Sequence, residues 1–140
     1  MDLRDFRQLA RTTAKILATI RCTIGITASV RPSLAVTPWV GAAESRRSAV
    51  QVLGRALAGR DLALGAGAIL AESDLALAKL VALGAFADGV DFLATLHAFK
   101  QLPRGGRVVV LGSTFGALAT GLVVAKLLVS DSQQSTGTQA

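Results

Sequence analysis

The 140-residue chain is poor in aromatic residues, in charge and above all in cysteine. It contains no Tyr, one Trp, five Phe and the single Cys22. One cysteine excludes an internal disulfide and a cysteine-rich metal site, and it leaves the redox compartment open. Charged residues make up 17% of the chain, whereas a soluble domain averages about 25%. These shortages argue against an ordinary water-soluble core.

Small and aliphatic residues take the place of the missing types. Hydrophobic residues reach 51%, there are 14 Gly, and the mean hydropathy is +0.52. Gly and Ala let helices approach closely inside a bilayer, where large side chains are not needed to fill a core. The length allows one domain, and no repeat of 20–50 residues is visible. The composition therefore favours a membrane-embedded helical bundle.

Positive charge exceeds negative charge, and it gathers beside the apolar runs. The chain has 15 Lys and Arg against 9 Asp and Glu. The basic clusters are Arg4, Arg7, Arg11 and Lys15; Arg31, Arg46 and Arg47; and Lys100, Arg104 and Arg107. Such clusters anchor helix ends to anionic headgroups, so a lipid bilayer is the expected partner. No nucleic-acid partner is expected, because no basic stripe with stacking aromatics is present.

Four apolar runs are long enough, or nearly so, to form spanning helices. They cover residues 13–30, 48–71, 75–99 and 108–129, and the last begins with eighteen uncharged residues. A secretory signal is the alternative for the first run, but Arg21 interrupts its apolar stretch and favours retention. The connection at 31–47 is predicted to be a loop because it holds Pro32, Pro38 and Gly41.

The predicted fold class is all-α, an antiparallel four-helix transmembrane bundle in the cell membrane with several passes. The expected parts are a basic N-terminal segment (1–12), the membrane domain (13–129) and a disordered polar tail (130–140). Six basic residues fall on each side of such a bundle, so charge counting does not decide its orientation.

Glycines in the last run look at first like a dinucleotide-binding turn. The required third-position glycine is replaced by Thr114, and too little chain follows for a parallel sheet. No cofactor is therefore expected. Gly112, Gly116 and Gly121 instead resemble the small-residue faces through which membrane helices pack, and they predict a homo-oligomer.

Charges also occur inside three of the runs, where they are costly. The midpoints of the first three runs lie at Arg21, at the Arg60–Asp61 pair and beside Asp88. A lone charge at such a depth costs about 2.5–3.5 kcal/mol on insertion scales, so these charges should face inward and pair.

A second level of charge lies about 6 Å from the first if the helices are antiparallel. It pairs Arg55 with Asp91, and Asp91 shares a helix face with Asp88. We therefore expect a neutral network of three Arg and three Asp residues.

Two interpretations of this network stay open. It fixes helix register in an accessory or interaction component, or it serves an enzyme or carrier for a lipid or isoprenoid. In the second case Asp88 or Asp91 acts as general acid or proton relay beside Arg60, and the substrate-binding candidates are Arg21, Arg55 and Asp61. A cavity beside Asp88 or Asp91 would favour the second interpretation. No metal site is expected.

Three short stretches carry a resemblance. "GRDLALG" (59–65), an Arg ahead of "IGITA" in the first run, and "DGVD" (88–91) resemble a family of small bacterial four-span integral membrane proteins of unknown function. The resemblance covers most of residues 13–129. It implies an integral membrane location and the same charged positions, and it brings no activity.

Overall fold

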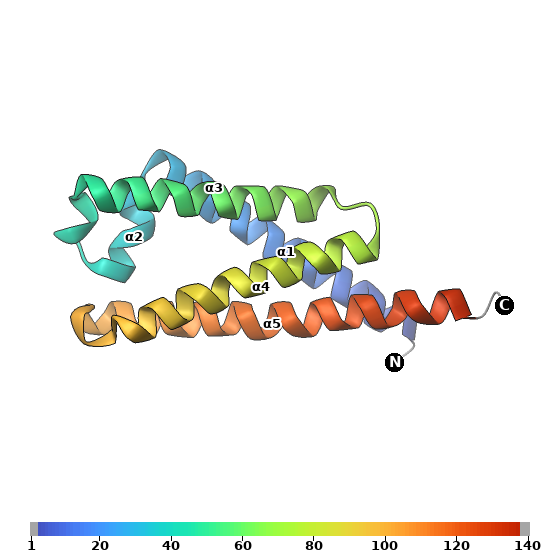
Figure 1. The fold of residues 1–140 in the computed structure, drawn as a ribbon. Coiled ribbons are helices and arrows are strands. Elements are labelled where there is room, and N and C mark those ends of the chain that lie inside the picture. Colours follow the sequence, from blue (N-terminus) through green and yellow to red (C-terminus); the bar gives the residue numbers. More distant parts are fainter. Residues whose placement is uncertain (1–2, 138–140) are drawn as a thin grey trace.

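The structure is a computed structural model that describes the backbone of residues 3–137 and the side chains of residues 5–130. Its helices are α1 (Leu3–Val30), α2 (Pro32–Val40), α3 (Ser48–Leu70), α4 (Asp74–His97) and α5 (Arg104–Gly137), with single 3₁₀ turns at Glu44–Arg46 and Phe99–Gln101. No strand occurs in the described range, so the all-α prediction is confirmed. The four long helices run in alternating directions (Figure 1).

Both ends of the bundle extend further than the apolar runs. α1 begins at Leu3 and takes in most of the basic segment predicted for 1–12, because Ala10 and Ala14 continue the buried face of the helix. α5 continues past Val129 to Gly137. Of the predicted disordered tail, residues 138–140 and the side chains from 131 onward lie outside the described residues.

The predicted loop at 31–47 is wrong for residues 32–40, which form α2. Pro32 occupies the first turn, where a helix has no use for its N–H. Pro38 lies near the other end, so few hydrogen bonds are lost. Gly41 then ends the helix at a φ of +86°, and its N–H donates to the Thr37 carbonyl over 2.9 Å.

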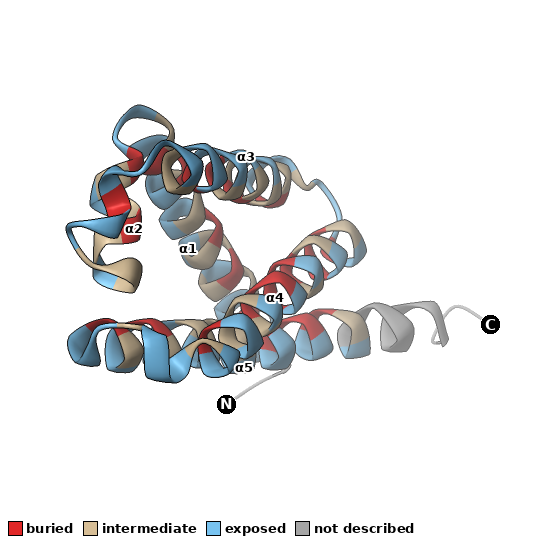
Figure 2. Ribbon diagram, turned by 60° about the vertical axis from the view of Figure 1, so that its left-hand side comes forward, coloured by how far each residue is buried: buried red, intermediate tan, exposed pale blue. Residues whose placement is uncertain are grey.

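The long helices form two tightly packed pairs. α1 packs along α3 and α4 packs along α5, whereas contacts between the pairs are sparser. Figure 2 shows the two pairs diverging, with buried positions on the sides that face other helices. Glycine makes the first pair possible: a Cβ on Gly65 would lie 2.8 Å from the Ala18 carbonyl oxygen, and one on Gly25 would lie 2.9 Å from the Ala58 carbonyl oxygen. The backbones of α1 and α3 are therefore in close contact.

Small apolar residues are mostly buried, and many of the large ones are exposed on the surface of the bundle. The buried core is mostly Ala, including Ala14 and Ala58. Large side chains lie outside: Leu70 is 76% exposed, Val108 74% and Phe86 71%. Among the described helices, only α5, over Arg104–Ser130, is long and apolar enough to cross a membrane by length and composition. Of its most apolar 18-residue stretch, 22% is buried in the protein.

The three glycines expected to join copies of the chain do not share a face. A Cβ on Gly121 would meet the Ala85 Cβ at 2.9 Å, so Gly121 belongs to the contact with α4 of the same chain. Gly112 and Gly116 have no such neighbour within 4 Å and remain open. Only these two keep the predicted role in a homo-oligomer, which stays a prediction.

Replacing Gly65 by Ala is expected to force α1 away from α3 and to lower the free energy of unfolding by about 1–3 kcal/mol. The matched control is Gly59→Ala on the same helix, where an added Cβ meets nothing within 4 Å. The control should be neutral or stabilising by up to about 1 kcal/mol, as expected for Ala over Gly in a helix. Unfolding in detergent followed by circular dichroism measures both. Equal effects of the two substitutions would contradict the close packing.

Candidate functional site: an ion-paired network beside an apolar cavity

Arg21 of α1 joins α3 and α4 through its guanidinium group. Its Nη1 lies 3.0 Å from Asp61 Oδ1, and its Nη2 forms an ion pair with Asp88 Oδ2. Nη2 also donates to the Gly84 carbonyl oxygen over 2.8 Å. A single side chain thus contacts two carboxylates and one backbone carbonyl on the two neighbouring helices.

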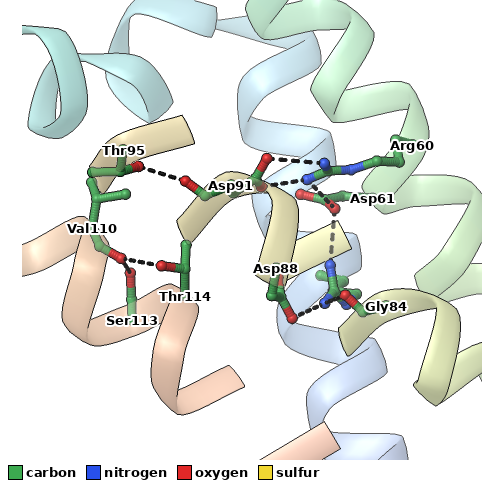
Figure 3. Close-up of polar contacts among 10 residues, drawn as sticks. Arg60, Asp61, Gly84, Asp88, Asp91, Thr95, Val110, Ser113 and Thr114 are labelled. Atoms are coloured by element: carbon green, nitrogen blue, oxygen red, sulfur yellow. Dashed lines mark hydrogen bonds and ion pairs between the residues drawn. The ribbon is translucent and has the colours of Figure 1, made fainter. Parts of the chain in front are cut away.

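Arg60 of α3 completes the network from the other side (Figure 3). Its Nη1 and Nη2 donate to the two oxygens of Asp91 over 3.2 and 2.8 Å, a bidentate geometry that fixes the plane of both groups. Nη2 also lies 3.3 Å from Asp61 Oδ1. Asp61 therefore accepts from both guanidinium groups and links the two halves of the network.

Local helix geometry explains why these side chains meet. Asp88 and Asp91 are three residues apart on α4 and share a face. Asp61 and Asp88 are each about nine-tenths buried, at 9% and 8% exposure. Asp61 points into the space between helices, and Arg60, about 100° further back around α3, reaches sideways to α4. The expectation that buried charges of these helices pair inside the bundle is confirmed, and Arg21 meets Asp61 and Asp88 as their shared level predicts. The pair of Arg60 with Asp91 was not predicted.

The predicted place of Arg55 in this network is wrong. Arg55 is exposed, and Asp91, its expected partner, pairs with Arg60 instead. Arg55 and Arg60 are five residues apart, which turns them about 140° from each other around the helix axis. Only one of the two can therefore face α4. The prediction compared only the positions of Arg55 and Asp91 along their helices and did not consider the direction in which each side chain points around its helix axis.

Gly84 is a site residue that charge counting did not reveal. A Cβ at this position would lie 3.0 Å from Arg21 Nε and 3.1 Å from its Nη2. The missing side chain makes room for the guanidinium group to lie across α4. Its one sequence signal is its position one helical turn before Asp88, on the same face.

A second, separate set of ion pairs closes one end of the bundle. Arg7 and Arg11 of α1 both pair with Asp74, which is buried at the start of α4. Lys15 donates to the carbonyl oxygens of Ala68 and Ile69 over 2.8 and 2.6 Å. Lys15 therefore satisfies carbonyls that the end of α3 leaves without helical partners. These contacts tie α1 to the connection between α3 and α4.

A cavity of about 310 Å³ lies between the two helix pairs. Its walls are mostly apolar and come from all five helices, with Leu17, Val36, Leu64 and Val110 among them. The single Trp39 of α2 also lines it. Its charged lining consists of the five network residues, Arg21, Arg60, Asp61, Asp88 and Asp91.

Two network carboxylates keep an oxygen available at this cavity. Asp61 uses Oδ1 and Asp88 uses Oδ2 for their guanidinium contacts. The second oxygen of each accepts no hydrogen bond from the described part of the chain, whereas both oxygens of Asp91 are held by Arg60. The site can therefore offer two further acceptors to a bound molecule.

Within the described residues no group of three or more His, Cys, Asp and Glu side chains could hold a metal ion. His97 lies exposed in the last turn of α4, and Cys22 lies against Gly65 in the α1–α3 contact. Neither residue lines the cavity. No family model, no curated protein and no solved structure matches the chain.

The pairing of Arg60 with Asp91 predicts a double-mutant effect. Arg60→Met alone leaves Asp91 without its partner and should lower the free energy of unfolding by about 3 kcal/mol. Adding Asp91→Leu removes the unpaired charge and should recover most of that loss. Arg55→Met is the matched control, because it removes an exposed Arg from the same helix and should change stability little. Thermal unfolding in detergent is measured for wild type, both single variants (Arg60→Met and Asp91→Leu), the double variant and the control. An additive double variant would disprove the pairing.

Proposed function

We propose that the chain is a multi-pass integral membrane protein that binds a molecule with a large apolar part between its two helix pairs. The cavity beside the ion-paired network is the observation that carries this proposal. A purely structural network would need only the space its own side chains fill. Here apolar walls and available carboxylate oxygens line a common space, which is the usual composition of a small-molecule site.

The membrane location is supported by the inside-out distribution of apolar residues. Small residues at helix contacts and large ones outside are expected where lipid is the solvent. The shortest long helix, α3, has 23 residues and measures about 35 Å, enough for a hydrocarbon core of about 30 Å. The charges that make α1, α3 and α4 less apolar than α5 include the five that meet inside the bundle. The exposed Arg55 can extend its head toward the near end of α3.

A four-span topology predicts that the two ends of α3 lie on opposite sides of the membrane. In a Cys22→Ala background, Glu44→Cys and Glu72→Cys place a thiol at an exposed position before and after α3. A membrane-impermeant maleimide added to sealed vesicles should label only one of the two, and detergent should expose the other. If α5 alone crosses the membrane, both positions lie on the same side and label together.

A structural or interaction role is the second candidate, and one observation favours it. Gly112 and Gly116 leave an open face on α5 on which a second copy could pack. A catalytic role in lipid or isoprenoid chemistry would depend on Asp88 rather than Asp91, because Arg60 holds both oxygens of Asp91. Binding in the cavity is common to the carrier and the enzyme, so binding is the function to test.

The neutral dye N-phenyl-1-naphthylamine is a suitable probe of the cavity, because it accepts energy from Trp39. We expect a saturable component of energy transfer above the background of dye in empty micelles. Ala117→Phe should remove it, because Ala117 lines the cavity and the added ring fills it.

Ala119→Phe is the control for this experiment. It makes the same change two residues along α5 at an exposed position and should leave the saturable component intact. Dye binding that is absent in the wild type, or unaffected by Ala117→Phe, would refute the proposed function.

A further inference from the structure

The network at the cavity is one positive charge short. Its two guanidinium groups belong to Arg21 and Arg60, and its three carboxylates belong to Asp61, Asp88 and Asp91. With all five groups ionised, the formal net charge is 2 − 3 = −1. Among the described residues no Lys and no His lines the cavity, so no further cationic side chain there balances the charge. The deficit follows from the outward position of Arg55.

An uncompensated charge is unfavourable in this location. Most of the cavity lining around the network is apolar, and charges interact more strongly in apolar surroundings than in water. A lone charge within a bilayer costs about 2.5–3.5 kcal/mol on insertion scales. A ligand that brings one positive charge removes this cost, whereas an anionic ligand doubles the imbalance.

The available hydrogen-bond acceptors point to the same ligand chemistry. Asp61 and Asp88 are each about nine-tenths buried, and each keeps one oxygen that accepts no hydrogen bond from described residues. These oxygens attract a cationic group. The rest of the cavity is apolar, which suits a hydrocarbon body better than a hydrated metal ion.

Resting on the proposed binding function, we infer that the molecule taken up by the cavity is a lipophilic organic monocation, such as an amine or ammonium compound with an apolar body. Its positive group lies beside the free oxygens of Asp61 and Asp88. Its apolar part lies against the walls formed by α1, α2, α3 and α5.

Two ions of nearly the same size and opposite charge test this inference. Tetraphenylphosphonium and tetraphenylborate are each titrated into purified full-length protein that carries N-phenyl-1-naphthylamine. The phosphonium ion should displace half of the dye at a lower concentration than the borate ion does. The measured quantity is the ratio of these two concentrations. Because micelles absorb the two ions unequally, this ratio is compared between wild type and variants in the same detergent.

Two variants remove the charge deficit in different ways. Asp88→Asn deletes one carboxylate, and Ser113→Lys adds a positive charge from α5, which contributes no charge to the network. Each should shift the ratio against the phosphonium ion by about tenfold or more. Ser113→Lys leaves every ion pair in place. If Asp88→Asn fails to fold, Ser113→Lys alone therefore tests whether the cavity prefers a cation.

Glu72→Gln is the matched control, since it removes the same unit of charge at an exposed position outside the cavity. It should keep the wild-type ratio. If dye binds but Ser113→Lys leaves the ratio unchanged, the cavity has no preference for cations and the inference is overturned while the proposed function stands. If the dye shows no saturable binding, both are overturned.

Discussion

The pairing of guanidinium and carboxylate groups between helices is the interaction on which this structure depends. Arg21 of α1 and Arg60 of α3 both contact Asp61, and each also pairs with a different carboxylate on α4. Because most of the surrounding residues are apolar, a broken pair would leave a partly buried charge without its partner. The network therefore sets the rotation of three helices about their axes at once.

Small residues provide the complementary constraint. Gly25 and Gly65 bring the backbones of α1 and α3 together, and Gly121 does the same for α5 against α4. At these glycines the backbones approach too closely for a larger residue, while Phe92 of α4 and Phe115 of α5 pack against each other elsewhere in the second pair. The result is two tight helix pairs that are joined both by ion pairs and by a small apolar core drawn from all four long helices. A cavity remains where the pairs diverge.

The cavity has apolar walls and one charged patch because the ion pairs are gathered at one place between the helix pairs. The walls are apolar because they belong to helices with few polar residues, and one patch is charged because the network lies there. Network residues also link the two helix pairs. Binding at this patch would therefore act directly on the contacts between the two pairs, and that couples occupancy of the cavity to the stability of the bundle.

Helix identity and the depth of each charge could be inferred from sequence, because both depend on spacing along the chain. The four long helices follow from the apolar runs, and the pairing of Arg21 with Asp61 and Asp88 follows from the midpoints of those runs. Proline content was misleading at α2, where both prolines occupy tolerated positions. Gly84 gave only a weak signal, since its role is to leave space for a side chain from another helix.

What the sequence by itself determined is which segments are helical, which residues are charged and how far along each helix they lie. Only the tertiary structure decided which way each charge points. Arg55 and Arg60 lie five residues apart on one helix, and a turn of about 140° places one outside and the other in the network. Helix rotation is set by packing against neighbours, which linear spacing does not contain. That rotation alone converts an expected neutral network into one that lacks a positive charge.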